Sequence, residues 1–140
     1  MDAFKEKELT EVIIRSFYKV YNNLGFGFLE KVYENALKIE LIKSNLIVES
    51  QQPLKVFYEN YQVGSYFADL VVNDKVILEL KADEILHPAH EAQLVNYLRE
   101  TDIEVGLLLN FGKRPQLKRK IWSNSNPRKS ACHLLITTTS

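Results

Sequence analysis

The chain has 140 residues, of which 46% are hydrophobic and 26% are charged, as expected for one soluble globular domain. This composition excludes a wholly disordered chain. Lys and Arg number 18, as do Asp and Glu, so the formal net charge is zero and any attraction to nucleic acid must come from a local patch.

Cysteine content and hydropathy restrict the class of protein further. Cys132 is the single cysteine, which excludes an internal disulfide and a cysteine-rich zinc site. Residues 1–8 lack the apolar core and the cleavage site of a secretory signal, and no apolar run is long enough to span a bilayer. The sequence therefore predicts a cytoplasmic protein without membrane contact.

Two helices are predicted first. Apolar residues recur at helical spacing from about Glu8 to Leu24, and two glycines then end that helix. A second helix is predicted from about Phe28 to Lys43. Its expected apolar positions are Leu29, Val32, Tyr33, Ala36, Leu37 and Leu41, with Ile39 and Ile42 widening the face.

Strand patterns follow the helices. Residues 47–49 are a short strand, Pro53 marks an edge or a turn, and strands are predicted over 54–58, 61–72 and 76–81. The last two are apolar on both faces, which indicates a central sheet covered by helices on each side.

The remaining chain adds a helix opened by Pro88 and reaching Glu100, and then a strand over 103–111. The predicted fold is therefore α/β, a mixed β-sheet core flanked by helices in the order α-α-β-β-β-α-β. We expect one domain over residues 1–122. We expect a polar tail over 123–140, poorly ordered or adding a late edge strand at its apolar cluster 134–136.

The chemistry concentrates in the hairpin Asp69-Leu-Val-Val-Asn-Asp-Lys-Val-Ile-Leu-Glu79-Leu-Lys81. Burying an unpaired carboxylate or ammonium among apolar residues costs several kcal/mol, so such groups are usually paired or bound to a metal. Two carboxylates are what Mg²⁺ requires of a protein, and a lysine beside them can stabilise a developing anion. The alternative is a set of solvent-exposed pairs that contribute little.

The register of this hairpin decides whether the two acids meet. Side chains alternate between faces, so a two-residue loop at Asn73-Asp74 would place Asp69 and Glu79 on opposite faces. They share a face only if the loop has an odd length or a bulge adds a residue. We therefore predict such an irregularity. Glu79 and Lys81, two residues apart, share a face already.

Two helices carry further polar pairs. Glu30 and Tyr33 lie on adjacent turns of the second helix, although Glu30 could simply complement the helix dipole. Gln93 and Tyr97 lie at i and i+4 of the later helix, where they could contact a substrate or form a half-buried amphipathic face.

Taken in order, these motifs resemble the GxxExxY proteins of the PD-(D/E)XK nuclease superfamily. The resemblance rests on Gly27, Glu30 and Tyr33, on Asp69, on Glu79-Leu80-Lys81, and on Gln93 and Tyr97. It extends from the first helix to about Trp122. Ala68 stands where the superfamily name places a proline, which removes no ligand.

The resemblance implies a restriction-endonuclease-like fold and hydrolysis of phosphodiester bonds in nucleic acid, with DNA the expected substrate and Mg²⁺ or Mn²⁺ the cofactor. It makes Asp69 and Glu79 metal ligands, with the Leu80 carbonyl as a further ligand and Glu30 contacting the metal directly or through water. Lys81 would orient the attacking water or stabilise the phosphate. The implied nucleic-acid contacts are Gln93, Tyr97 and Tyr33.

A basic cluster after the last strand includes Lys113, Arg114 and Lys118 and can hold a phosphate backbone, although it could equally be a solvated face. Because the chain has no large basic surface, we expect substrate binding to involve a homodimer or a partner protein. Two alternatives stay open. One is a catalytically silent nuclease fold that binds nucleic acid or protein, and the other is an oligomeric interaction protein with an exposed tyrosine-rich hairpin over 58–67.

Overall fold

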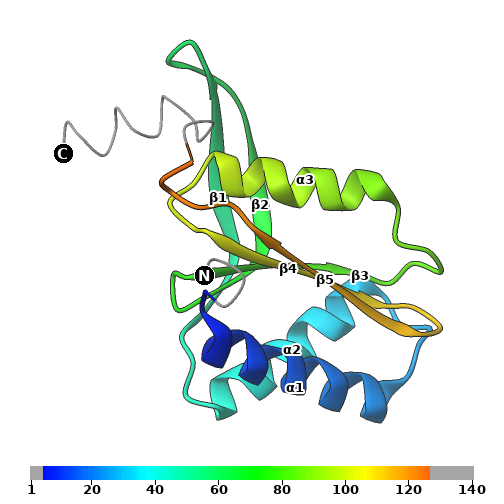
Figure 1. The fold of residues 1–140 in the computed structure, drawn as a ribbon. Helices are drawn as coiled ribbons and strands as arrows, with labels where there is room; N and C mark the ends of the chain where they lie inside the picture. The colour runs from blue at the N-terminus through cyan, green and yellow to red at the C-terminus, as the bar shows by residue number, and fades with distance from the viewer. Residues whose placement is uncertain (1–4, 127–140) are drawn as a thin grey trace.

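A five-stranded mixed sheet forms the middle layer, with the strands in the spatial order β1-β2-β3-β4-β5 (Figure 1). The computed structural model describes residues 5–126. β3 and β4 are parallel and the other neighbouring pairs are antiparallel. The strands are β1 (Val48–Tyr58), β2 (Tyr61–Val72), β3 (Val76–Lys81), β4 (Val105–Phe111) and β5 (Pro115–Ile121).

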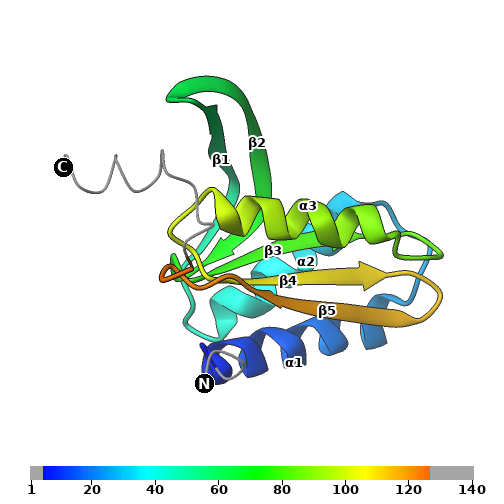
Figure 2. The same ribbon diagram turned by 45° about the horizontal axis from the view of Figure 1, so that its top comes forward.

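Helices cover both faces of this sheet, as the sequence predicts (Figure 2). α1 (Lys7–Leu24) and α2 (Glu30–Lys43) lie on one face, and α3 (Pro88–Arg99) lies on the other. Each helix buries residues spaced three or four apart, so one stripe faces the sheet. The buried residues of α1 and α2 in this core are Ile13, Phe17, Val20, Tyr33, Leu37 and Leu41.

The second core lies between α3 and the sheet, where Leu94 and Leu98 pack against apolar side chains of β2, β3 and β4. Gly106 permits this close approach, because a Cβ atom there would lie 2.8 Å from the Leu94 side chain. Every residue of β4 is buried. β3 and β4 therefore form a rigid centre on which the neighbouring elements are positioned.

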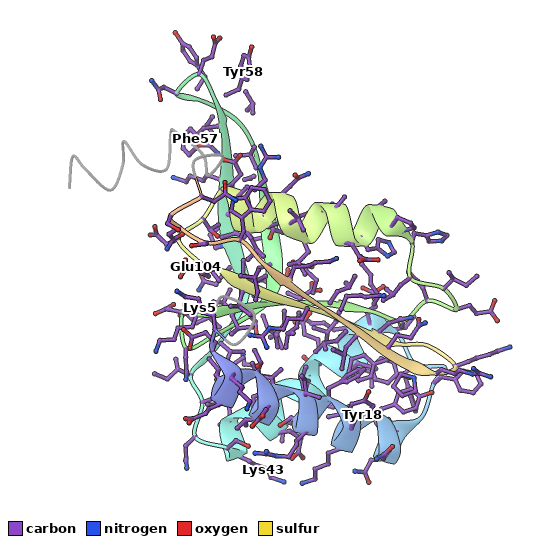
Figure 3. All side chains as sticks on the ribbon, viewed as in Figure 1. Lys5, Tyr18, Lys43, Phe57, Tyr58 and Glu104 are labelled. Atoms are coloured by element: carbon purple, nitrogen blue, oxygen red, sulfur yellow. The ribbon has the colours of Figure 1, made fainter. Side chains whose placement is uncertain are left out.

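β1 and β2 form a long hairpin that projects beyond the rest of the sheet (Figures 1 and 2). Its tip is a two-residue turn in which Glu59 and Asn60 both have positive φ, the geometry that matches the twist of a hairpin. Figure 3 shows Phe57 and Tyr58 at the far end of this arm. Pro53 lies inside β1, so the two predicted short segments are one strand, and an edge strand can accept a proline because one row of its amides is unpaired.

Two further predictions are corrected by the structure, and a third concerns residues that it does not describe. The basic run after β4 is a strand, β5, which the sequence pattern did not reveal. Leu29, Val32, Ile39 and Ile42 are exposed, so the buried stripe of α2 is narrower than predicted. The apolar cluster 134–136 and most of the predicted tail lie outside the described residues. Within residues 5–126, no helix is both long and apolar enough to cross a membrane.

Candidate active site

Asp69 of β2 and Glu79 of β3 come together where these two strands part. The ladder pairs Val72 with Val76 and Leu70 with Leu78, which leaves a three-residue loop at 73–75. Continuing this register places Asp69 opposite Glu79. The predicted odd-length loop is therefore confirmed, and Asn73 and Asp74 adopt positive φ to form it.

Asp69 occupies an irregular point of the sheet. The ladder between β2 and β3 stops at Leu70, and the Asp69 carboxylate instead accepts a hydrogen bond from the Leu80 backbone N–H at 2.8 Å. On the other side, Gln51 of β1 has a φ of 52° and falls between two regular pairs of the register. Ala68 packs with α3, whereas Leu70 packs with α1 and α2, although residues two apart in a regular strand share a face. At this fork, where β2 and β3 separate, the Asp69 carboxylate takes the place of a backbone carbonyl as the hydrogen-bond acceptor for the Leu80 N–H.

Glu79 is a carboxyl group held in an unfavourable setting. Its Oε1 atom is buried and has no hydrogen-bond partner among residues 5–126. Burial, followed by the charge of Asp69, raises the pKa of Glu79 to about 9, and the Lys81 ammonium opposes this only partly. Burial and the neighbouring Asp69 therefore disfavour the ionised form of Glu79, and a further positive charge would favour it.

Glu30 reaches the same area from the other face, as the first residue of α2. Partial burial is the main cause that raises its pKa, with smaller contributions from Asp69 and Asp83, while Lys81 lowers it. Glu30 therefore lies near enough to Asp69 and Lys81 for their charges to act on it. The structure therefore brings Asp69 and Glu79 together, with Glu30 and Lys81 near enough to interact electrostatically, and the roles of these residues stay predictions.

Tyr33 has a different place from the one predicted. Its ring is fully buried and stacks on Phe111 with centroids 4.3 Å apart, so it cannot contact nucleic acid, and that prediction is wrong. Its hydroxyl donates to the Gly25 carbonyl at 2.6 Å and accepts from the Phe28 N–H at 3.2 Å. Tyr33 thus fixes the turn that leads into Glu30.

Tyr97 of α3 lies close enough to the carboxylates to interact with them, and Gln93 lies one turn before it on the same helix. Burial, followed by the charges of Glu79 and Asp69, raises the pKa of Tyr97 to about 12, and a hydrogen bond with Gln93 lowers it slightly. Tyr66 of β2 stacks on Tyr97 with an interplanar angle of 17°. Tyr66 belongs to no motif, and its position in an apparently exposed hairpin gave no signal of this placement.

Asn110 is a second residue that the sequence reasoning missed. It is buried in β4 opposite Lys81, donates to the Asp83 carbonyl at 2.8 Å and accepts from the Asp83 N–H at 2.9 Å. These bonds fix the segment that follows Lys81. A single polar residue in the apolar run 105–111 was the available signal.

The sequence profile of the PD-(D/E)XK nuclease superfamily matches residues 7–121. The chain belongs to this superfamily. The crystal structure of SSO0001 resembles it with a TM-score of 0.53 and 19% identity, over 99% of this chain and 68% of that one, a likeness that concerns the fold alone. Comparison with curated proteins finds no match. The finer resemblance to GxxExxY proteins stays a prediction.

Members of the PD-(D/E)XK superfamily typically use divalent metals, and the donors of this chain fit one. Oε1 of Glu79, which has no hydrogen-bond partner among the described residues, and the adjacent Asp69 carboxylate are two oxygen donors whose charge Lys81 offsets only in part. Mg²⁺ takes few protein carboxylates and keeps several waters. Within residues 5–126 no three His, Cys, Asp or Glu side chains are grouped so that they could hold a metal ion.

The predicted basic cluster is only partly available to a nuclease substrate. Lys113 and Arg114 are exposed at the turn between β4 and β5, and Lys113 forms an ion pair with Glu84 at 3.1 Å. Lys118 is exposed on β5, where the pKa of Glu91 of α3 is lowered mainly by a hydrogen bond with Lys120 and to a smaller extent by the charge of Lys118. The cluster therefore lies along β5 and its turn, with part of its charge neutralised by acids.

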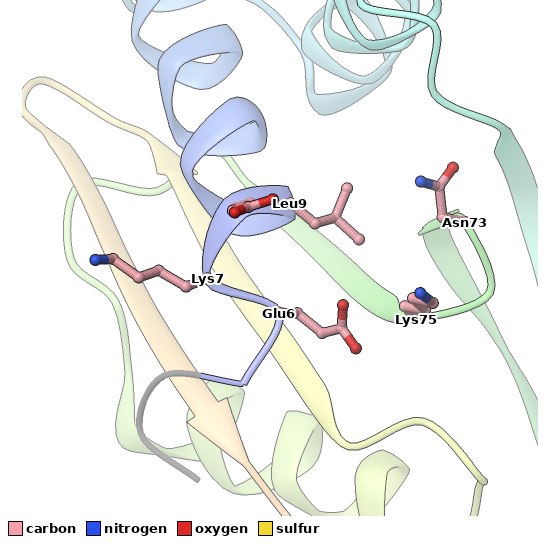
Figure 4. A pocket seen from close by; sticks show the side chains of 6 residues that line it. Glu6, Lys7, Leu9, Asn73 and Lys75 are labelled. Carbon is pink, nitrogen blue, oxygen red and sulfur yellow. The ribbon is translucent and has the colours of Figure 1, made fainter. Parts of the chain in front are cut away.

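A pocket of about 480 Å³ lies elsewhere in the fold, between the start of α1 and the turn from β2 to β3 (Figure 4). Its lining includes Glu6, Lys7, Leu9, Asn73 and Lys75. This turn is at the opposite end of β3 from Lys81. The pocket is therefore separate from the carboxylates.

Proposed function

We propose that this protein is a nuclease that hydrolyses phosphodiester bonds in nucleic acid, with DNA as the substrate and Mg²⁺ or Mn²⁺ as the cofactor. The observation that carries the proposal is the meeting of Asp69 and Glu79 at the fork between β2 and β3, with Lys81 two residues further along β3. A site for binding alone would have no physical need for two desolvated carboxylates and a lysine.

Each residue has a distinct task in this proposal. Asp69 and Glu79 would hold the cation, with the Leu80 carbonyl as a third donor, and the cation supplies positive charge against the developing negative charge of the phosphate. Asp69 is already oriented by its hydrogen bond from the Leu80 N–H. Glu30 would act through water.

Lys81 would donate a hydrogen bond to the attacking water or to a phosphate oxygen, which favours the transition state over the bound substrate. Water attacks the phosphorus, the bond to the leaving oxygen breaks, and that oxygen receives a proton. Gln93 and Tyr97 would bind the nucleic acid from α3, while Lys113, Arg114 and Lys118 would attract its backbone at longer range.

The test combines cleavage with metal binding. Wild type, Asp69→Asn and Glu79→Gln are titrated with Mg²⁺ and Mn²⁺ by calorimetry and incubated with labelled single- and double-stranded DNA and RNA. Asp74→Asn is the matched control, since Asp74 is an exposed carboxylate in the loop of the same hairpin.

We expect metal binding and cleavage in wild type and in the control, and loss of both in the two site variants. Folded wild-type protein that binds DNA or RNA but neither cation, and cuts neither, would identify a silent binding module instead. Cleavage of RNA alone would refute the choice of DNA.

A further inference from the structure

Tyr66 joins the candidate site from the base of the projecting hairpin. It lies on β2, three residues before Asp69, and its ring stacks on Tyr97 of α3. Two flat rings held at 17° to each other leave the phenol little freedom to turn. The stack therefore fixes the direction of the Tyr66 hydroxyl.

That hydroxyl is buried and has no hydrogen-bond partner among the described residues. A buried hydroxyl without a partner is costly, and buried polar groups in proteins are normally paired with protein atoms, water or a bound ion or ligand. Gln93, the nearby amide on α3, already interacts with Tyr97. A second buried atom of the same site, Oε1 of Glu79, also lacks a partner.

The Tyr66 hydroxyl is available as a donor. Burial, followed by the charges of Glu79, Tyr97 and Asp69, raises the pKa of Tyr66, so the phenol keeps its proton at neutral pH. A neutral donor beside two carboxylates can bind an anion without adding a charge that the fold would have to compensate. Phosphate oxygens are acceptors of this kind.

We propose that the Tyr66 hydroxyl is a phosphate-binding group of this site, donating a hydrogen bond to a non-bridging oxygen of the phosphodiester that is cut. The proposal rests on the nuclease function. It adds a contact outside the Asp, Glu and Lys motif and gives the hairpin arm a direct part in the site. The stack on Tyr97 positions the donor before the substrate arrives.

The test compares wild type with Tyr66→Phe, which removes the hydroxyl and keeps the stacked ring. Tyr61→Phe is the matched control, because Tyr61 lies on the same strand with 75% of its surface exposed. Single-turnover cleavage is measured on substrates carrying sulfur in place of either non-bridging oxygen at the cut. Both Mg²⁺ and Mn²⁺ are used, because the softer Mn²⁺ relieves sulfur effects that arise at a cation.

We expect Tyr66→Phe to slow cleavage of the normal substrate by about 10- to 100-fold, with an unchanged calorimetric affinity for Mg²⁺. Wild type and Tyr61→Phe should cut one sulfur diastereomer slowly even in Mn²⁺. Tyr66→Phe should lose this discrimination and cut that diastereomer about as fast as the normal substrate. This loss of discrimination would not follow from a role in packing.

The same sulfur discrimination in wild type and Tyr66→Phe would overturn the inference while leaving the nuclease function intact. A weaker affinity of Tyr66→Phe for Mg²⁺ with unchanged discrimination would also overturn it, since the hydroxyl would then support Glu79. Wild type that cuts no nucleic acid would refute the nuclease function, and this inference with it.

Discussion

Replacing the Glu79 carboxyl group by an amide in Glu79→Gln should make the stability of the cation-free protein less sensitive to pH. The carboxyl group has a pKa of about 9 in the folded chain and an ordinary value of 4.5 in the unfolded chain. Between these values the folded state binds the extra proton, so stability is greatest at low pH and falls as the pH rises towards 9. Gln at this position has no proton to lose.

The magnitude follows from this difference in proton binding. Between pH 5 and 7 the unfolded state is mostly ionised at this group while the folded state keeps its proton, so the folded state holds close to one more proton than the unfolded state. Each pH unit then costs about 1.4 kcal/mol, so the free energy of unfolding of wild type should fall by about 2 to 3 kcal/mol relative to Glu79→Gln. Solvent contact at the partly exposed side chain makes this an upper value.

Urea denaturation at pH 5, 6 and 7 with a chelator measures this difference, and Asp74→Asn reports how an exposed carboxylate of the same hairpin behaves. Mg²⁺ should reverse the effect, because it favours the ionised carboxylate and should release close to one proton at pH 7. Calorimetry in two buffers of different ionisation enthalpy counts that proton. Parallel pH slopes for wild type and Glu79→Gln, together with no proton release, would refute the reasoning.

Three further changes probe the site and its support. Lys81→Met should slow single-turnover cleavage by about 10²- to 10³-fold while its urea midpoint stays close to that of wild type. Retained cleavage would remove Lys81 from the mechanism. Asn110→Ala leaves the backbone of Asp83 without its partners and should cost about 2 to 3 kcal/mol in urea denaturation, a prediction that an unchanged midpoint would contradict. Tyr33→Phe should cost about 1 kcal/mol of stability and slow cleavage further than that loss explains, because the turn before Glu30 loosens; wild-type cleavage would show that this turn does not matter.

Much of the fold could be predicted from hydrophobic periodicity. The apolar stripe of α1 identifies the side of that helix that is buried. β2 and β3 are apolar on both faces, which requires helices on both sides of the sheet. β5 could not be found in this way, because none of its residues is buried and four of its seven side chains, Gln116, Lys118, Arg119 and Lys120, are polar. It becomes a strand by pairing along the whole of β4, which is a tertiary effect.

The candidate site could also be predicted only in part. Local turn preference favours a two-residue loop at Asn73-Asp74, and that loop would have separated Asp69 from Glu79. The requirement that two buried carboxylates share one cation predicted the longer loop instead, and the structure has it. Tyr33 shows the limit of motif reasoning, since a tyrosine that holds a turn by hydrogen bonds looks in sequence like one that contacts a substrate. Tyr66 shows the converse: its contribution depends on the stack with Tyr97 across the fork, a contact between elements distant in the chain that no local pattern encodes.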